Sequence, residues 1–232
     1  LKTELIITAK ILGHKLVIGP AFNGVYIVDL FTNKIIHINR NNSLKNNSIL
    51  SIASDHENDI WLGLDNGIAH IEINSPYSIF ADNSGILGSV YTVSPYNSGF
   101  LLGSNHGVFS YQNSKLTFVE NSQGQVWDIN KIDDFYLIGH NDGTYILNQN
   151  SFKKISSITG GWQLLKSDFD NHYFMSHYAG IIAFDKSNIQ NFKILAGLTK
   201  PIKNIAQNKL GELWAVDNYK SLYKIDYNAD YQ

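Results

Sequence analysis

Short stretches of alternating apolar and polar residues, separated by turn-forming residues, run along the whole chain. Three of them follow one another near the first tryptophan: residues 49–53 (ILSIA), 60–63 (IWLG) and 68–73 (IAHIEI). Alternation with period two and β-branched residues are typical of strands. Between them lie a polar cluster, residues 55–59, and the hairpin sequence 65–67 (DNG), whose Asn and Gly accept positive φ. The pattern predicts a unit of three antiparallel strands.

The chain repeats this unit. The second strand recurs as LVIG at 16–19, WLGL at 61–64, FLLG at 100–103, YLIG at 136–139, YFMS at 173–176 and LWAV at 213–216. The residue that closes each hairpin recurs about 40 residues apart, as Gly24, Gly67, Gly107, Gly143, Gly180 and, by alignment, Lys220. A short fourth strand follows four of the hairpins: KIIHI, KLTFV, FKKIS and FKILA. The six predicted units are 4–41, 48–80, 89–119, 125–157, 161–195 and 201–227.

Units of four short strands at a period of about 40 residues are the signature of a β-propeller. A β-sandwich has turns at similar spacing but lacks this self-similarity between units, and helical repeats lack the alternation. We therefore expect an all-β chain that forms one β-propeller region over residues 1–232, with four-stranded antiparallel blades. Six repeats are visible, and they are either the whole propeller or part of a seven-bladed one.

Composition excludes several classes of function. The net charge is −2 and Arg40 is the one arginine of the 232 residues, whereas nucleic-acid binding favours a basic face with arginines. The absence of cysteine suits an intracellular protein as well as an exported bacterial one. No apolar run approaches the roughly 18 residues that a membrane span needs, so we expect no membrane insertion by this segment. We also expect no nucleic acid as a partner.

Motifs of catalysis are missing as well. The chain has no H-E-x-x-H helix, no G-x-S-x-G elbow and no phosphate-binding glycine loop. The single arginine rules out a sialidase-type arginine triad. We expect no catalytic residues and no cofactor, and a propeller lyase or hydrolase is the weakest hypothesis.

Three histidines, His106, His140 and His177, fall in the turns between the second and third strands. In a propeller such turns share one face near the channel, where a ring of imidazoles is able to bind a metal. They occupy different positions in their turns, so the interpretation as tolerated polar turn residues is favoured, and we expect no metal site.

The innermost strands carry aromatic residues where a ligand would reach them. Alignment of these strands places Leu50, Tyr91, Trp127, Gln163 and Lys203 at one position, with Trp162 one place earlier at a position that favours core packing. Mixed aromatic and polar character fits the rim of a pocket, where sugar faces stack on rings. Variable channel lining without a ligand is the alternative. Trp61 and Trp214, in the second strands, are expected in the core.

Together with the neighbouring turns, these positions give a set of candidate ligand-binding residues. The candidates are Tyr91, Trp127, Trp162, Gln163, Lys203, His106, His140, Asp142, His177, Tyr178, Asp217 and Tyr219. Asn and Asp in such turns also have a local role, because their side chains bind nearby backbone groups.

Two units resemble the two-component regulator propeller repeat. The second unit has the pattern S-hLSI-x-x-D-x-x-x-x-IWLG-x-x-x-G-h, where h is an apolar residue, and the sixth has IKNIAQNKLGELWAV. The second unit departs from the family by having Asn58 at the expected turn glycine, and units three to five keep the strands without the D-x-x-G-x-h-W core. Such repeats build the sensor regions of Bacteroidetes hybrid two-component systems and of regulators with a triple-tyrosine motif. The family arranges them as seven-bladed propellers, usually periplasmic, and the ending NYKSLYKIDY resembles the last repeat before the triple-tyrosine domain.

The resemblance implies a piece of a larger bacterial regulator of transcription, a periplasmic sensor responsive to carbohydrate. The resemblance further implies a ligand derived from an oligo- or polysaccharide, a homodimer formed through the full-length protein, and a kinase module elsewhere in that protein. From the residues alone, a non-catalytic scaffold for protein–protein interaction remains the main alternative.

Overall fold

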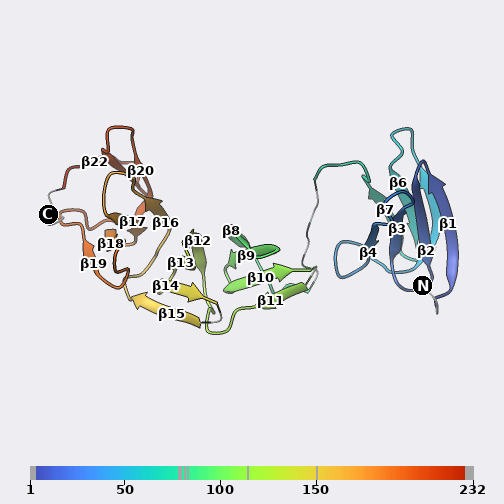
Figure 1. Cartoon of the computed structure of the whole chain (residues 1–232), viewed down its shortest axis with the longest axis horizontal. Coiled ribbons are helices and arrows are strands. Elements are labelled where there is room, and N and C mark those ends of the chain that lie inside the picture. The colour runs from blue at the N-terminus through green and yellow to red at the C-terminus, as the bar shows by residue number, and fades with distance from the viewer. Residues whose placement is uncertain are drawn as a thin grey trace. The chain divides into compact units, whose positions relative to one another are not determined.

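The structure is a computed structural model and describes residues 4–77, 80, 82, 84–113, 115–149 and 151–227. Every regular element in the described residues is a β-strand (Figure 1). The chain divides into two compact units, residues 1–86 (unit 1) and residues 87–232 (unit 2). Each unit is described by itself.

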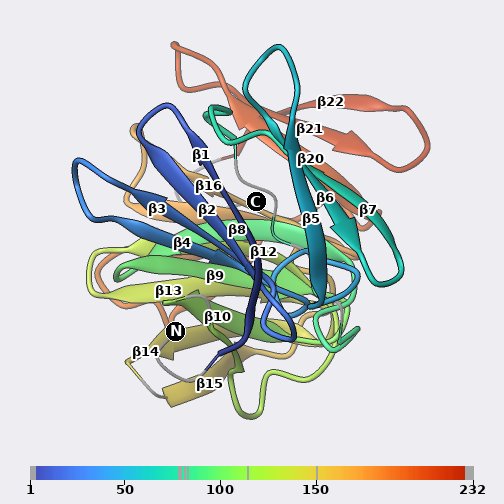
Figure 2. The ribbon, with the colours of Figure 1, turned by 90° about the vertical axis from the view of Figure 1, so that its right-hand side faces the viewer.

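Unit 1 holds two sheets. Its strands are β1 (Ile6–Leu12), β2 (Lys15–Pro20), β3 (Val25–Asp29), β4 (Ile35–Ile38), β5 (Ile49–Ser54), β6 (Ile60–Leu64) and β7 (Gly67–Ile71). They pair in chain order as β1-β2-β3-β4 and β5-β6-β7, every pair antiparallel. Figure 2 shows β5, β6 and β7 side by side.

Unit 2 holds four sheets of the same kind. Its strands are β8 (Val90–Tyr96), β9 (Gly99–Ser104), β10 (Val108–Gln112), β11 (Lys115–Phe118), β12 (Val126–Ile132), β13 (Phe135–His140), β14 (Gly143–Asn148), β15 (Ser151–Ser156), β16 (Gln163–Lys166), β17 (His172–His177), β18 (Gly180–Asp185), β19 (Phe192–Ile194), β20 (Ile202–Gln207), β21 (Leu213–Asp217) and β22 (Leu222–Ile225). Three sheets have four strands, and the last, β20-β21-β22, has three. Each sheet is one blade, and we number the blades 1 to 6 along the chain.

The predicted fold class is confirmed: the chain is all-β and built of propeller blades. Four-stranded sheets occur where the sequence showed a fourth strand, and blades 2 and 6, where it showed none, have three described strands. The grouping of all six blades in a single propeller over residues 1–232 stays a prediction. Part of the expected linker 81–88, residues 81 and 83, lies outside the described residues.

The core of each unit lies between neighbouring blades. In unit 1, Val17 and Ile27 of blade 1 pack against Ile49 and Leu62 of blade 2. In unit 2 the same arrangement joins blades 3 and 4, blades 4 and 5, and blades 5 and 6. Phe174 sits in the last of these clusters with no exposed surface. Strand alternation explains the pattern, because one face of each strand supplies one interface and the opposite face supplies the next.

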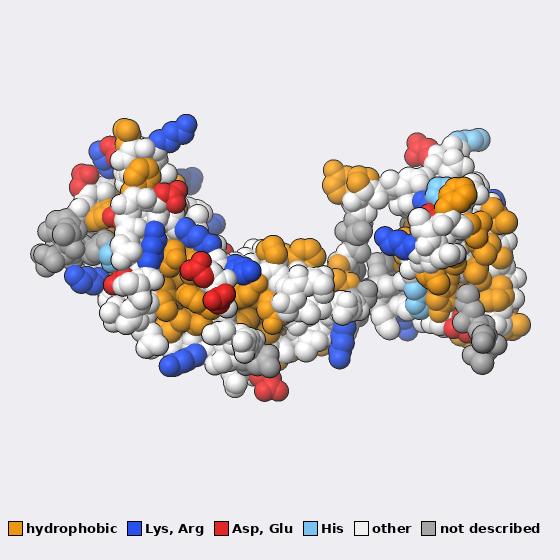
Figure 3. Space-filling view, in the orientation of Figure 1, with side chains coloured by type: hydrophobic (Ala, Val, Ile, Leu, Met, Phe, Trp, Pro, Cys, Tyr) orange, Lys and Arg blue, Asp and Glu red, His pale blue; other side chains and the backbone are white. Residues whose placement is uncertain are grey.

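The other face of blade 1 is apolar and partly exposed. A row of Ile11, Leu16, Val28 and Ile35 crosses all four strands, and its end members are 65% and 60% exposed. Figure 3 shows hydrophobic side chains at the surface of unit 1. In unit 2 the faces between blades are covered by the neighbouring blade.

Two non-glycine residues occupy turn positions that favour glycine. Lys220, aligned with the hairpin glycines, has a φ of 72°, and Asn58, at the expected turn glycine of the second unit, has a φ of 63°. Both values lie in the left-handed region, which Asn tolerates better than most residues. In register, however, Ser221 stands opposite Asp217, where Gly143 and Gly180 stand opposite His140 and His177, so the blade 6 hairpin is one residue longer and Lys220 lies one place before the residue equivalent to those glycines.

In the part of the chain that the structure describes, no helix is long and apolar enough to cross a membrane.

Candidate ligand-binding site

The innermost strand of five blades contains a β-bulge near its start. The register shifts occur between Ile6 and Thr8, Ile49 and Ser51, Val90 and Thr92, Val126 and Asp128, and Ile202 and Asn204. A bulge leaves one residue unpaired and turns its side chain away from the regular sheet. We call this position the bulge slot, and it holds Ile7, Leu50, Tyr91, Trp127 and Lys203.

Blade 5 corrects one step of the sequence alignment. Gln163 pairs with Ser176, four residues before the hairpin glycine Gly180, as Asp128 pairs with Gly139 four residues before Gly143. Gln163 is therefore equivalent to Asp128, and Trp162 takes the bulge slot. The predicted equivalence of Gln163 with Trp127, and the core position for Trp162, are wrong. The shorter strand β16, which begins at Gln163, concealed the offset.

Side chains next to the bulge slot join neighbouring blades. The backbone N–H of Leu164 donates to Asp128 Oδ2 at 2.7 Å, and the N–H of Ile205 donates to Gln163 Oε1 at 2.8 Å. Each bond runs from one innermost strand to the corresponding place in the next. Burial raises the pKa of the Asp128 carboxyl above its usual value, against the lowering effect of the Leu164 hydrogen bond. Gln163 thus acts as a connector between blades 5 and 6.

A glycine contact brings blades 4 and 5 especially close. A Cβ at Gly139 would lie 1.8 Å from the carbonyl oxygen of Gly161, so the two backbones touch. At the place of Gly161, blades 2, 3, 4 and 6 have Ile49, Val90, Val126 and Ile202. The small residue draws the start of the innermost strand of blade 5 towards blade 4, and Trp162 follows directly after it.

Four aromatic side chains of unit 2 form a continuous series, which we call the aromatic row: Tyr91, Trp127, Trp162 and Tyr178. Ring centroids lie 5.0 Å apart between Tyr91 and Trp127, 6.3 Å between Trp127 and Trp162, and 4.6 Å between Trp162 and Tyr178. The first three come from the bulge slots of blades 3, 4 and 5. Tyr178 comes from the turn after β17, so the structure joins predicted strand and turn residues in one site.

Polar groups fix the ends of the aromatic row. Gln125 Nε2 donates to the Tyr91 hydroxyl at 3.1 Å, and the Tyr178 hydroxyl donates to Asn141 Oδ1 at 2.8 Å. Tyr91 is 45% exposed, and both tryptophans are half-buried. The Trp127 indole N–H is buried and makes no hydrogen bond within the described residues. An unpaired buried donor favours any arrangement that brings an acceptor to it.

Beneath the aromatic row, the last residue of each second strand in unit 2 is buried and polar. This position, the corner slot, holds Ser104, His140, His177 and Asp217, and unit 1 has Leu64 there in blade 2. Three of the four bind their own turn: backbone N–H groups of His106, Asp142 and Tyr219 donate to Ser104, His140 and Asp217. Asp217 also accepts from the Ser221 N–H and the Tyr223 hydroxyl. The corner slot therefore fastens the hairpin.

His177 differs from the other corner residues because it reaches back to the preceding segment. Its Nδ1 lies 3.2 Å from the carbonyl oxygen of Thr159, to which it donates as the neutral ring. Burial lowers its pKa to about 4, so the ring is uncharged at neutral pH. The Nε2 atoms of His177 and His140 are buried and have no hydrogen-bond partner within the described residues.

The remaining candidates lie on the turns. His106, Asp142 and Tyr219 are exposed, and Asp142 forms a network with Lys154 Nζ at 3.0 Å and the Tyr145 hydroxyl at 2.9 Å. Within the described residues, the three histidines do not gather into a group able to hold a metal ion. Lys203 occupies the bulge slot of blade 6 and is exposed.

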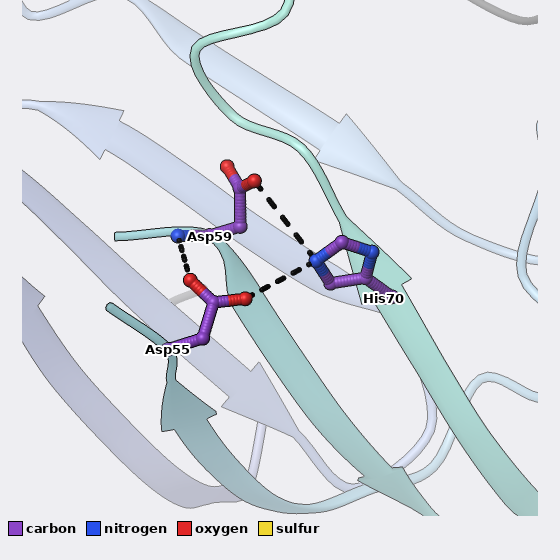
Figure 4. A group of neighbouring side chains, drawn as sticks. All are labelled: Asp55, Asp59 and His70. Carbon is purple, nitrogen blue, oxygen red and sulfur yellow. Dashed lines mark hydrogen bonds and ion pairs between the residues drawn. The ribbon is translucent and has the colours of Figure 1, made fainter. Parts of the chain in front are cut away.

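One cluster in unit 1 was not singled out by the sequence reasoning. Asp55, Asp59 and His70 offer ligand atoms that all lie within 4.8 Å of one another (Figure 4). Asp55 Oδ1 accepts the N–H groups of Glu57 and Asp59, both at 3.0 Å, and its Oδ2 accepts the Trp61 indole N–H at 2.8 Å. Asp59 Oδ1 accepts the N–H of Ile73 at 3.1 Å. These bonds close the β5–β6 turn, so both oxygens of Asp55 and one oxygen of Asp59 already serve the fold.

The same bonds explain the position of Trp61. Its ring stacks on His70 with centroids 4.4 Å apart and is 40% exposed in the structure of unit 1. Within unit 1 the Trp61 indole N–H reaches the half-buried Asp55 carboxylate, and the expected core position of Trp61 between blades stays a prediction. Trp214 is half-buried.

Residues 43–66 match the family model described as "Two component regulator propeller". This segment is therefore similar to one two-component regulator propeller repeat. The match contains β5, the Asp55 turn and β6, so the resemblance drawn from the second unit is confirmed where its motif is clearest. No curated protein matches the chain.

Several solved propeller structures resemble the chain. One is the extracellular domain of a putative hybrid two-component system from B. thetaiotaomicron, with a TM-score of 0.54, 17% identity, and coverage of 97% of this chain and 34% of that one. The extracellular domain of a second such system from B. thetaiotaomicron gives a TM-score of 0.52 and 22% identity, with coverage of 95% and 36%. The WD40 β-propeller domain of Doa1 gives 0.50 and 13%, with coverage of 98% and 80%.

At these identities the likeness shows the fold, which is that of a β-propeller. The chain spans about a third of the length of the two B. thetaiotaomicron domains.

Proposed function

We propose that this chain is part of a ligand-sensing β-propeller in a bacterial signal-transduction regulator, that it lies in the periplasm or outside the cell, and that its ligand is a carbohydrate. The similarity of residues 43–66 to the two-component regulator propeller repeat supports the signalling role. The similar B. thetaiotaomicron domains are named as extracellular, which supports the location. The observation that carries the ligand class is the aromatic row.

The aromatic row offers what a sugar ligand needs. Sugars present apolar C–H faces that pack on aromatic rings, while their hydroxyls need a few fixed polar partners. The rings of Trp127 and Trp162 belong to bulge slots of adjacent blades and touch in series. The Asn141 amide and the Gln125 amide stand at the two ends. A chain of sugar rings laid across blades 3 to 5 would contact both kinds of group.

Binding without turnover fits the chemistry beside the row. The Asp128 carboxylate next to Trp127 is engaged by the Leu164 N–H, and His177 is neutral and buried. A general acid or base must reach the bond that it breaks, and neither group is free to do so. We therefore assign the chain a sensory role, with any kinase activity and homodimer contact in other parts of the full-length protein.

Signal transmission requires two arrangements of the regulator with different affinity for the ligand. A ligand shifts such an equilibrium only by the ratio of its affinities for the two states. Because neighbouring blades are joined by packed cores and by the Asp128 and Gln163 hydrogen bonds, a movement of whole propellers or subunits is favoured over deformation of one blade.

The experiment is a thermal-shift screen of the 232-residue chain against plant, host and microbial oligosaccharides. We expect one class to raise the melting temperature, because binding to the folded state alone stabilises it. Trp127→Ala should abolish the shift, and Phe22→Ala, at an 81% exposed aromatic of unit 1, should preserve it. If no oligosaccharide shifts the folded chain, the sensor proposal fails and the scaffold for protein interaction becomes the better account.

A further inference from the structure

The bulge slots of unit 2 form a series whose last member is a cation. Blades 3, 4 and 5 place Tyr91, Trp127 and Trp162 in this slot, and blade 6 places Lys203 there. Because the three aromatic rings touch in the order of the blades, the next position in that order continues the series.

Hydrogen bonds hold the start of β20 against blade 5. The Ile205 N–H donates to Gln163 Oε1 at 2.8 Å, and the Ser176 hydroxyl lies 3.4 Å from the carbonyl oxygen of Lys203. Both contacts come from residues adjoining the Trp162 slot in the sheet of blade 5. The backbone of Lys203 is therefore held against blade 5, next to the residues that adjoin the Trp162 slot.

The charge of Lys203 is not neutralised within the described residues. Its side chain is exposed and forms no hydrogen bond or ion pair there, whereas Lys200 bonds the Tyr223 hydroxyl and Lys186 bonds the Asp170 carbonyl oxygen. The neighbouring innermost strand, β16, carries no carboxylate, and Asp128 in the innermost strand of blade 4 is engaged by the Leu164 N–H. An exposed, unpaired ammonium in the slot that follows Trp162 in blade order is a place for an anionic group of a ligand.

We propose that the ligand of the aromatic row is an acidic oligosaccharide, whose carboxylate or sulfate binds Lys203 while its sugar faces stack on Trp162 and Trp127. This inference rests on the proposed carbohydrate-sensing function and adds the charge of the ligand. The rings supply affinity for sugar faces of any kind, and Lys203 selects those that carry negative charge.

The test compares matched ligands. Oligogalacturonides, alginate oligomers and hyaluronan oligomers are each titrated into the 232-residue chain by calorimetry, beside the same oligomers with their carboxyl groups reduced to alcohols. Expected is binding of one acidic series at least about tenfold tighter than its reduced counterpart, the effect of one charge-assisted hydrogen bond. Raising NaCl from about 50 mM to about 500 mM should reduce the difference in affinity between the acidic oligomer and its reduced counterpart, because salt screens exposed charges.

Variants assign the preference to Lys203. Lys203→Met should weaken binding of the acidic oligomer about tenfold and leave the reduced one unchanged, and Lys203→Arg should retain the preference. Lys209→Met, at an exposed lysine of the β20–β21 turn, is the matched control and should change neither. If acidic and reduced oligomers bind equally and depend on Trp127, the sensor proposal stands and the acidic ligand is refuted. If no oligomer of either kind binds while the thermal-shift screen identifies a neutral oligosaccharide, the sensor proposal stands and the acidic ligand is refuted; if the screen is silent as well, both proposals are contradicted.

Discussion

The two units repeat one blade plan, yet their bulge slots hold different chemistry. In unit 1 the slot holds Ile7 and Leu50, which are 45% and 53% exposed, and in unit 2 Tyr91 at the same slot is 45% exposed. The blade fold thus accepts an aliphatic or an aromatic residue at this slot. Because the blade does not require rings at this slot, we attribute the aromatic row of unit 2 to ligand binding.

A second comparison concerns aspartates at different turns of the two units. They perform the same structural task. Blade 2 closes its β5–β6 turn with Asp55, which accepts two backbone N–H groups and the Trp61 indole N–H. Blade 6 closes its hairpin with Asp217, which accepts two backbone N–H groups and the Tyr223 hydroxyl. A polar residue at a turn therefore has a structural explanation that must be set aside before a functional one is assigned.

The largest expected effect separates core aromatics from slot aromatics. Phe174→Ala should lower the free energy of unfolding by about 3–5 kcal/mol, because it removes a fully buried ring between blades 5 and 6. Urea denaturation followed by circular dichroism gives the value. Phe22→Ala, at an 81% exposed ring, should stay within about 0.5 kcal/mol of the parent chain. Similar losses of unfolding free energy in the two variants would contradict the distinction between buried and exposed aromatic residues.

The next prediction concerns the pH dependence of stability at the corner slot. This slot holds the titratable residue His177 in blade 5 of unit 2 and the apolar residue Leu64 in blade 2 of unit 1. The pKa of His177 is lowered by burial to about 4, from 6.5 in the unfolded chain. Between these values the unfolded state binds more protons, so stability rises with pH. Its contribution is fully present above pH 6.5, is lost progressively as the pH falls towards 4, and amounts to about 3 kcal/mol.

The variant His177→Asn removes this titration and keeps an amide N–H at the position of Nδ1, able to donate to the Thr159 carbonyl oxygen. Chemical denaturation at several pH values from 4.5 to 7 should show a slope of stability against pH that is smaller in the variant by up to one proton. An unchanged slope would mean that His177 is not held neutral by burial.

The smallest effect sharpens the comparison of turns. Asp55→Ala should lower the melting temperature by a few degrees, roughly 2–6 °C, because three N–H groups lose their acceptor. The Trp61 hydrogen bond lowers the pKa of Asp55, so the difference between parent and variant should shrink in acid as that carboxylate takes up a proton. Asp65→Ala, an exposed residue of the β6–β7 turn, is the control. Scanning calorimetry at pH 7 and pH 3 provides the four comparisons.

Most of the fold was predictable because strand alternation and hairpin glycines are local signals. Lys220 was aligned with the hairpin glycines by spacing alone, which did not reveal that the hairpin of blade 6 is one residue longer. The fastening role of Asp55 was not predicted, since it depends on a hydrogen bond to Trp61 across the turn.

The candidate site was partly predictable. Tyr91 and Trp127 were aligned correctly, and Tyr178 was named among the turn residues that the structure brings to the row. Trp162 was misplaced because β16 begins only at Gln163, so the paired strand that fixes the alignment in the other blades does not include Trp162. Gly161 was a usable signal in the sequence, because it replaces the branched residue that blades 2, 3, 4 and 6 have at this place. In the structure it contacts Gly139.

The central claim is that the bulge slot binds ligand in unit 2 and serves only the fold in unit 1. The most direct test is a calorimetric titration of the oligosaccharide found by the thermal-shift screen into two variants at this slot, Trp127→Ala and Leu50→Ala. We predict a loss of affinity of at least about tenfold for Trp127→Ala, as for a central aromatic contact, and none for Leu50→Ala. Equal affinity in both variants, with both chains folded, would contradict the account.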